Sequence, residues 1–145
     1  MSKKKAPQVE AGDILEVTPE ELERLLSEER TKGRRSKYNN QHVELDGFTF
    51  DSKAESLRYL ELKALSQEAK IDRLVVHPKY TVIPSFVDID GAAWPAITYE
   101  ADFEYYDLSG ILIIEDVKGV ETDVFKLKAA LMRWKIHHTT RFVII

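Results

Sequence analysis

The feature that most constrains the fold is a short polar turn between two segments of alternating apolar residues. The segments cover residues 96–106 and 111–118, and the turn between them ends in Gly110. A three-residue loop with glycine in the left-handed conformation is a common connection between antiparallel strands. The sequence therefore predicts a hairpin in which Asp107 pairs with Ile111.

This register brings acidic residues of the two strands together. It places Asp102 opposite Asp116 and Glu100 opposite Lys118, and because side chains alternate along a strand, these four share one face. Glu115 lies on the other face and is its polar exception. The rest of that face is apolar and consists of Tyr99, Ala101, Phe103, Ile111, Ile113 and Val117.

Two directly opposed carboxylates repel each other unless a cation or a proton lies between them. We expect Mg²⁺ between Asp102 and Asp116, with Mn²⁺ as a substitute, because these ions prefer oxygen ligands. Lys118 could then orient or deprotonate a water molecule on the ion. The alternative is a surface hairpin with solvent-facing acids and a Glu100–Lys118 ion pair.

Glu55 has two interpretations. The segment Ser52-Lys53-Ala54-Glu55 fits a capping box, in which the glutamate satisfies a helix terminus. Glu55 could instead be a third acidic residue beside the metal. The residue pattern leaves both interpretations open.

The remaining segments predict an α/β domain with a mixed sheet flanked by helices. Helices are expected over residues 19–30, 52–69 and 123–137, and further extended segments over 43–50, 74–76, 80–83 and 141–145. Apolar spacing suggests an inner side of the second helix made of Leu57, Leu60 and Ala64. The inner stripe of the last helix is expected to be Phe125, Ala129, Met132 and Ile136.

The chain divides into an arm and a compact domain. We expect residues 1–35 to form an N-terminal arm with a short acidic helix and a basic linker, and residues 36–145 to form the domain. The net charge of -4 arises entirely within residues 1–29, so the remainder is neutral and its basic residues form local clusters. A phosphate backbone would interact with such clusters more than with net charge.

Several classes of protein are excluded. No apolar run approaches the roughly 20 residues needed to span a bilayer, so we expect no membrane insertion. The chain has no cysteine, which removes disulfides and cysteine nucleophiles and favours the cytoplasm. No glycine-rich phosphate loop is evident, so no nucleotide cofactor is expected.

One basic cluster is a candidate for DNA contact. It combines cations, amides and an aromatic ring, which suit phosphate contacts and base stacking: Arg34, Arg35, Lys37, Tyr38, Asn39 and Asn40. Its alternative is a polar linker. Lys126, near the start of the last helix, could also reach the DNA, or could simply be solvated.

Three motifs together resemble the PD-(D/E)XK nuclease superfamily. They are Phe50-Asp51-Ser52-Lys53-Ala54-Glu55, Tyr99-Glu100-Ala101-Asp102-Phe103 and Glu115-Asp116-Val117-Lys118-Gly119. The chain looks particularly like small phage-encoded members related to archaeal-type Holliday junction resolvases. The resemblance spans about residues 36–145 and implies a restriction-endonuclease-like core, with a central mixed sheet between helices.

The resemblance also implies roles for individual residues. Asp102 and Asp116 would be metal-binding acids, Lys118 the catalytic lysine and Glu55 a helix-borne acid that assists the metal, with Val117 as a further metal contact. The sequence departs from the superfamily pattern in two places. Ala101 stands where the superfamily name has proline, and Asp116 stands where resolvases more often have glutamate. The neighbouring Glu115 leaves open which acid coordinates, although strand alternation favours Asp116.

The function implied by the resemblance is Mg²⁺-dependent hydrolysis of phosphodiester bonds in DNA. We expect a homodimer that resolves four-way junctions in recombination and repair, within the bacterial host cytoplasm if the gene belongs to a phage. One alternative is a phage repair or restriction-like endonuclease that acts on duplex DNA. The other is a DNA-binding accessory protein without catalysis.

Overall fold

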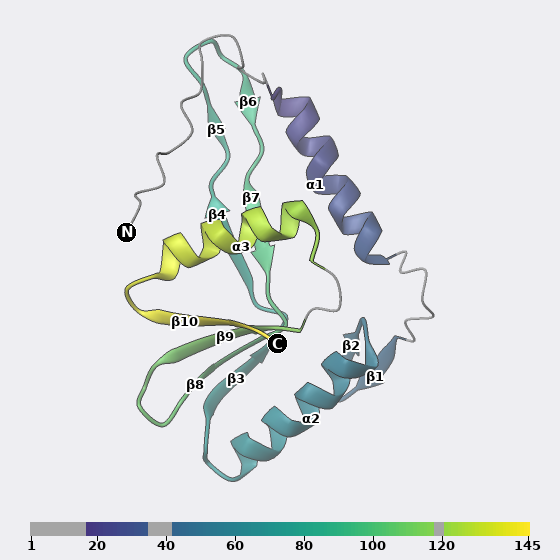
Figure 1. Ribbon diagram of the computed structural model, residues 1–145, viewed down its shortest axis with the longest axis vertical. Coiled ribbons are helices and arrows are strands. Elements are labelled where there is room, and N and C mark those ends of the chain that lie inside the picture. The colour runs from purple at the N-terminus through teal and green to yellow at the C-terminus, as the bar shows by residue number, and fades with distance from the viewer. Residues whose placement is uncertain (1–16, 35–41, 118–120) are drawn as a thin grey trace, which may run out of the picture.

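The computed structural model describes residues 17–34, 42–117 and 121–145. In this part of the chain the elements follow one another as shown in Figure 1. The helices are α1 (Pro19–Arg34), α2 (Lys53–Gln67) and α3 (Asp123–Ile136). The strands are β1 (Val43–Leu45), β2 (Phe48–Phe50), β3 (Asp72–Val76), β4 (Lys79–Ile83), β5 (Phe86–Val87), β6 (Ala93–Trp94), β7 (Ile97–Glu100), β8 (Phe103–Tyr106), β9 (Leu112–Asp116) and β10 (Thr140–Ile144).

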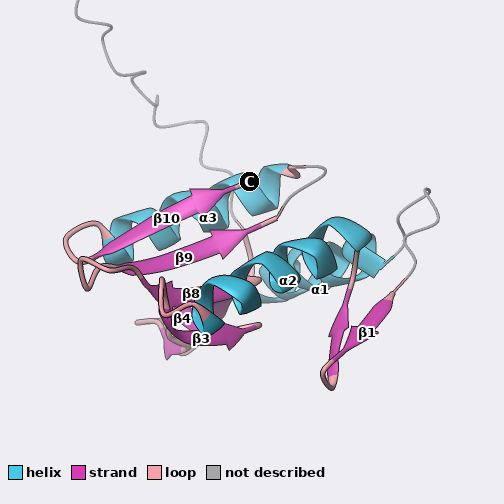
Figure 2. Cartoon of the chain, turned by 90° about the horizontal axis from the view of Figure 1, so that it is seen from below, coloured by secondary structure: helices cyan, strands magenta, loops and turns pink. Residues whose placement is uncertain are grey.

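A mixed sheet forms the centre of the molecule. Its strands lie in the order β10-β9-β8-β3, with β9 antiparallel to β8 and β8 antiparallel to β3. Strand β10 is parallel to β9, and α3 is the crossover between them. Helix α2 and helix α3 lie on opposite sides of the sheet (Figure 2). The predicted α/β class with a mixed sheet is therefore confirmed.

The turn before β9 fixes the hairpin register as the sequence predicts. The Asp107 amide donates to the Ile111 carbonyl at 3.0 Å, and the Asp107 side chain accepts from the amides of Ser109 and Ile111. Gly110 has a φ of 77°. The resulting pairing, Phe103 with Glu115 along the strands, is the predicted one.

The long strand predicted before the turn is instead broken into β7 and β8. The break at Ala101 and Asp102 lies opposite His77 and Pro78, where the Ala101 amide donates to the Pro78 carbonyl and the His77 amide to the Asp102 carbonyl. Proline has no amide hydrogen to donate, and His77 has a left-handed φ of 54°. The regular ladder therefore ends there, and β7 continues by pairing with β4.

The break also changes the face of the sheet on which the preceding residues lie. Phe103 and Ile113 pack on the α2 side, as predicted, whereas Tyr99 and Ala101 pack on the α3 side with Ile114. The prediction that all four share one face was wrong, because it assumed uninterrupted alternation through the kink.

Two apolar layers hold the helices to the sheet. Beneath α3, the predicted stripe is confirmed: Phe125, Ala129 and Met132 are buried, and Ile136 packs against them. Beneath α2, the predicted side was wrong, because Leu57 and Leu60 are 51% and 46% exposed. The helix buries a stripe with polar members instead, made of Glu55, Ser56, Tyr59 and Leu62.

Two parts of the chain extend from this core. Strands β4 to β7 form a two-stranded arm that projects beyond the sheet, with Phe86 and Trp94 stacked near its tip (Figure 1). Helix α1 contacts α3 and continues to Arg34, so residues 31–34, predicted as linker, are helical. None of the described helices is long and apolar enough to cross a membrane.

We predict that Gly110→Ala lowers the free energy of unfolding by about 1 kcal/mol, because alanine disfavours a left-handed φ. Steric overlap would not contribute, since no atom lies within 4 Å of the added Cβ. Urea unfolding measures the effect, and Gly110→Asn, which tolerates this conformation better, should lose less. An alanine variant as stable as the natural chain would contradict the left-handed turn.

Candidate metal centre

The predicted pair of aspartates lies where the β8–β9 hairpin meets the break. The Asp102 amide donates to the Glu115 carbonyl at 3.1 Å, so Asp102 is bonded to β9 although β8 begins only at Phe103. Asp116 ends β9 and is fully buried, and the Tyr99 hydroxyl donates to its carboxylate. The Val117 amide donates to Asp102 Oδ2 at 2.5 Å. Main-chain and phenol donors thus orient both acids.

The surroundings of Asp102 disfavour its ionised form. Burial, then the charges of Asp116 and Glu55, raise the pKa of Asp102 from its ordinary value of 3.8 to about 8. A hydrogen bond between the Asp102 and Asp116 side chains acts in the same direction, and the Val117 amide opposes it. A divalent cation at this place would stabilise the ionised carboxylates that the surroundings otherwise disfavour.

Glu55 serves the helix terminus and also faces Asp102. Its amide donates to Ser52 Oγ at 3.1 Å, and its Oε2 accepts from the Asp51 amide at 3.1 Å, which confirms a capping role. Its other oxygen, Oε1, lies 2.7 Å from His77 Nε2. The Glu55 carboxylate is buried, and one of its oxygens faces the candidate centre. The assignment of Glu55 as a metal ligand stays a prediction.

His77, which no sequence pattern indicated, also belongs to this group. One ligand atom each of Glu55, His77 and Asp102 lie within 4.8 Å of one another. The hydrogen bond to Glu55 raises the pKa of His77, since it favours the protonated imidazole, while burial opposes this. The sequence does show a histidine before a proline, between two extended segments. It does not show which strand lies opposite this histidine.

Glu115 occupies the opposite face, as alternation predicts. Arg58 of α2 binds it with two hydrogen bonds of 2.7 and 2.8 Å, and the Tyr105 hydroxyl donates to it at 2.5 Å. Burial, together with the bond to Glu115, raises the pKa of Tyr105 to about 12. These contacts give Glu115 a structural role and separate it from the aspartate pair.

The other predicted site residues that the structure describes have partners outside this group. Lys118 lies outside the described residues, and Glu100 forms an ion pair of 3.2 Å with Lys79 across β4 and β7. Lys126 forms an ion pair of 3.8 Å with Asp123 of its own helix. The predicted DNA contacts Arg35, Lys37, Tyr38, Asn39 and Asn40, and the side chain of Arg34, also lie outside the described part of the chain.

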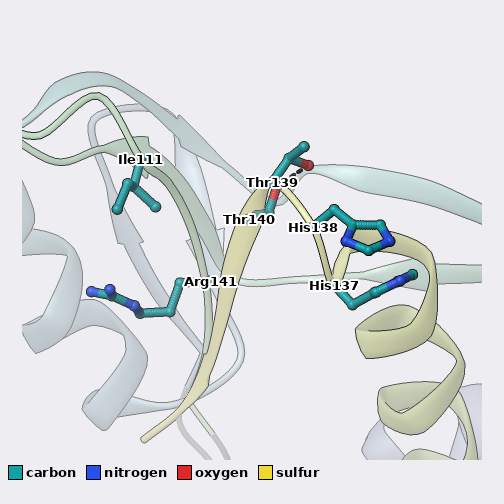
Figure 3. Close-up of a pocket in the computed structure, with 6 residues that line it drawn as sticks. All are labelled: Ile111, His137, His138, Thr139, Thr140 and Arg141. Carbon is teal, nitrogen blue, oxygen red and sulfur yellow. Dashed lines mark hydrogen bonds between the residues drawn. The ribbon is translucent and has the colours of Figure 1, made fainter.

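A separate pocket lies at the other end of β9 from Asp116, between Ile111 and the α3–β10 connection (Figure 3). The rings of His137 and His138 lie 3.6 Å apart on one side of it. The guanidinium of Arg141 points away from them in Figure 3. The polar groups therefore do not converge on one point, as those of the candidate centre do.

Most of this chain matches one protein family. The sequence model of a family described as a protein of unknown function (DUF1064) matches residues 35–144. The chain belongs to this family. All members of the candidate centre lie within the DUF1064 match, as does Lys118. Neither the curated proteins nor the solved structures gave a match.

We predict that Arg58→Ala lowers the free energy of unfolding by roughly 3–5 kcal/mol, because it leaves the Glu115 carboxylate buried without its cation. Urea unfolding measures this loss. The double change Arg58→Met and Glu115→Gln should recover part of it, since it removes both charges. Lys70→Ala, which removes an exposed ion pair with Glu68, is the control and should stay within about 0.5 kcal/mol of the natural chain.

A second prediction follows from the raised pKa of Asp102. The folded chain holds the proton of the Asp102 carboxyl more tightly than the unfolded chain does. The free energy of unfolding therefore falls as pH rises from the ordinary pKa of 3.8 toward about 8. Asp102→Asn cannot titrate and keeps an oxygen acceptor for the Val117 amide. In metal-free buffer its stability advantage should therefore grow by up to about 1.4 kcal/mol per pH unit.

Urea unfolding of both proteins between about pH 5 and pH 8 measures this difference. A difference in stability that is constant across the range would contradict the raised pKa. Asp72→Asn, which changes an exposed aspartate of the same sheet, is the control variant.

Proposed function

We propose that this DUF1064 protein is a metal-dependent endonuclease that hydrolyses phosphodiester bonds in DNA. The observation that carries the proposal is the convergence of Asp102 and Asp116 at the end of two paired strands, in surroundings that disfavour the ionised form of Asp102. Strongly perturbed carboxyl groups that meet in this way are more typical of functional sites than of structural ones.

The arrangement of elements supports a restriction-endonuclease-like core. The order is α2, strand β3, the arm, strands β8 and β9, then α3 and β10, which agrees with the helix, strands, helix, strand order of the resemblance. Asp116 ends the central strand β9, Asp102 lies just before the adjacent strand β8, and the helix-borne Glu55 of α2 lies near Asp102. This arrangement supports the resemblance to the PD-(D/E)XK superfamily.

The residues present fit a divalent cation of the Mg²⁺ or Mn²⁺ type. We assign it to the carboxylates of Asp102, Asp116 and Glu55, with the main-chain carbonyl of Val117 as a further ligand. Such an ion, when bound, would polarise a phosphodiester and make water a better nucleophile. The donor set is rich in hard oxygen atoms, which these ions prefer.

The chain's own groups hold the acids in place. The Tyr99 hydroxyl and the Val117 amide orient Asp116 and Asp102, and the Asp51 amide fixes Glu55. Donors of this kind restrict the carboxylates to one arrangement before any ligand binds, which is how outer contacts support metal sites. Lys118, two residues after Asp116, is the proposed catalytic lysine that orients the attacking water.

The proposed substrate is branched DNA, with a homodimer that cuts the two strands of a four-way junction symmetrically. The basic segment around residues 34–40 and Lys126 would contact phosphates. The test is Mg²⁺-dependent cutting of a synthetic four-way junction beside a linear duplex of the same sequence. Paired nicks in the junction would support this substrate, and equal cutting of both would indicate a duplex endonuclease. Binding without cutting would overturn the enzyme proposal.

We predict that Asp102→Asn and Asp116→Asn each lower cleavage by at least about 100-fold, because each removes a proposed metal ligand. Junction binding should survive, since asparagine preserves a hydrogen-bond acceptor for Val117 or Tyr99. Gel assays of cutting and binding with the same DNA measure both effects. Asp72→Asn should cut normally, and retained activity in either site variant would refute the assignment.

A further inference from the structure

We propose that His77 supplies a nitrogen ligand to the cation held by Glu55 and Asp102, and so shifts the site toward Mn²⁺ and other first-row transition ions over Mg²⁺. The inference rests on the cation site of the proposed function, but it does not depend on DNA cleavage. It also assigns a role to a side chain that none of the three PD-(D/E)XK motifs contains.

The positions of the three side chains carry the inference. His77 Nε2 lies 2.7 Å from Glu55 Oε1, and one ligand atom of each residue, Asp102 included, lies within 4.8 Å of the others. Ligands about 2.1 Å from one ion are about 3 Å apart when adjacent and about 4.2 Å apart when opposite. Small side-chain movements would therefore bring all three atoms onto a single cation.

The backbone holds His77 in this place. Its amide donates to the Asp102 carbonyl at 2.9 Å, directly across the break, and its ring packs 5.7 Å from the Phe50 ring. Its φ of 54° is a sparsely populated conformation for a residue other than glycine, particularly before a proline. Such strain persists where surrounding structure enforces it, and it is concentrated at functional sites.

Exposure and ligand chemistry indicate what would bind. The His77 side chain is 28% exposed, whereas Glu55 is 7% exposed, so the imidazole lies on the solvent side of the buried acid. Carboxylates alone suit Mg²⁺, while an imidazole nitrogen favours transition ions, whose affinity for nitrogen ligands is higher. Adding one imidazole to the acids therefore predicts a change in metal preference.

The test uses the full-length chain with Mn²⁺ as the probe and no DNA. Pulsed electron paramagnetic resonance detects an imidazole nitrogen bound to Mn²⁺, and histidine labelled with heavy nitrogen identifies its source as histidine. We expect this coupling in the natural chain and its loss in His77→Asn, which tolerates the left-handed backbone. Affinity for Mn²⁺ should fall about 10-fold or more, and affinity for Mg²⁺ by less.

His137→Asn is the matched control, because this exposed histidine lies at the C-terminal end of α3, and it should retain the coupling. His77→Gly, which also accepts the backbone conformation, guards against a folding defect in the asparagine variant, and circular dichroism checks both. Bound Mn²⁺ without histidine coupling in the natural chain would overturn the role of His77 and leave the carboxylate site intact.

The two proposals fail in distinguishable ways. Absence of Mn²⁺ binding by the natural chain would overturn both the cation site and the role of His77. Histidine coupling that is present in the natural chain and lost in His77→Asn would support the inference, even if no DNA substrate were cut. In that case the nuclease proposal alone would fail.

Discussion

The register of the β8–β9 hairpin decides which acidic side chains meet at the end of the sheet. The turn closed by Gly110 pairs Phe103 with Glu115, and this pairing carries Asp102 to the buried carboxylate of Asp116. Because strand side chains alternate, a slip of one residue would send Glu115 to that position and Asp116 to the α2 side. The candidate centre therefore depends on a turn at the far end of the same hairpin.

Glu115 and Asp102 illustrate two ways to bury a carboxylate. Glu115 lies against the guanidinium of Arg58 and the hydroxyl of Tyr105, which compensate its charge within the fold. Asp102 instead lies beside two further carboxyl groups, and its pKa rises because burial and their charges disfavour ionisation. The first arrangement is complete without a ligand, whereas the second gains stability from a cation. This contrast separates a structural acid from a candidate functional one.

Local patterns predicted the parts of this structure that local forces determine. Turn chemistry predicted the hairpin register, and the capping box that begins at Ser52 marked the start of α2. Apolar periodicity failed for α2, because its buried stripe includes Glu55 and Tyr59, whose polar groups have partners inside the fold. His77 and Asp46, the partners of Glu55 Oε1 and of the Tyr59 hydroxyl, come from segments outside the helix, so the apolar spacing within it could not indicate them.

The break in the sheet has the same origin, and it contributes most to the candidate centre. Pro78 cannot donate to the strand opposite it, so the ladder stops beside Ala101 and Asp102. That interruption places His77 across from Asp102, within reach of the capping glutamate of α2. In an uninterrupted strand the side chains would keep their regular alternation, and the main-chain groups would all bond to the neighbouring strand. The chemistry of the site thus depends on a departure from the regular pattern, and this is the feature that pattern-based reasoning is least able to predict.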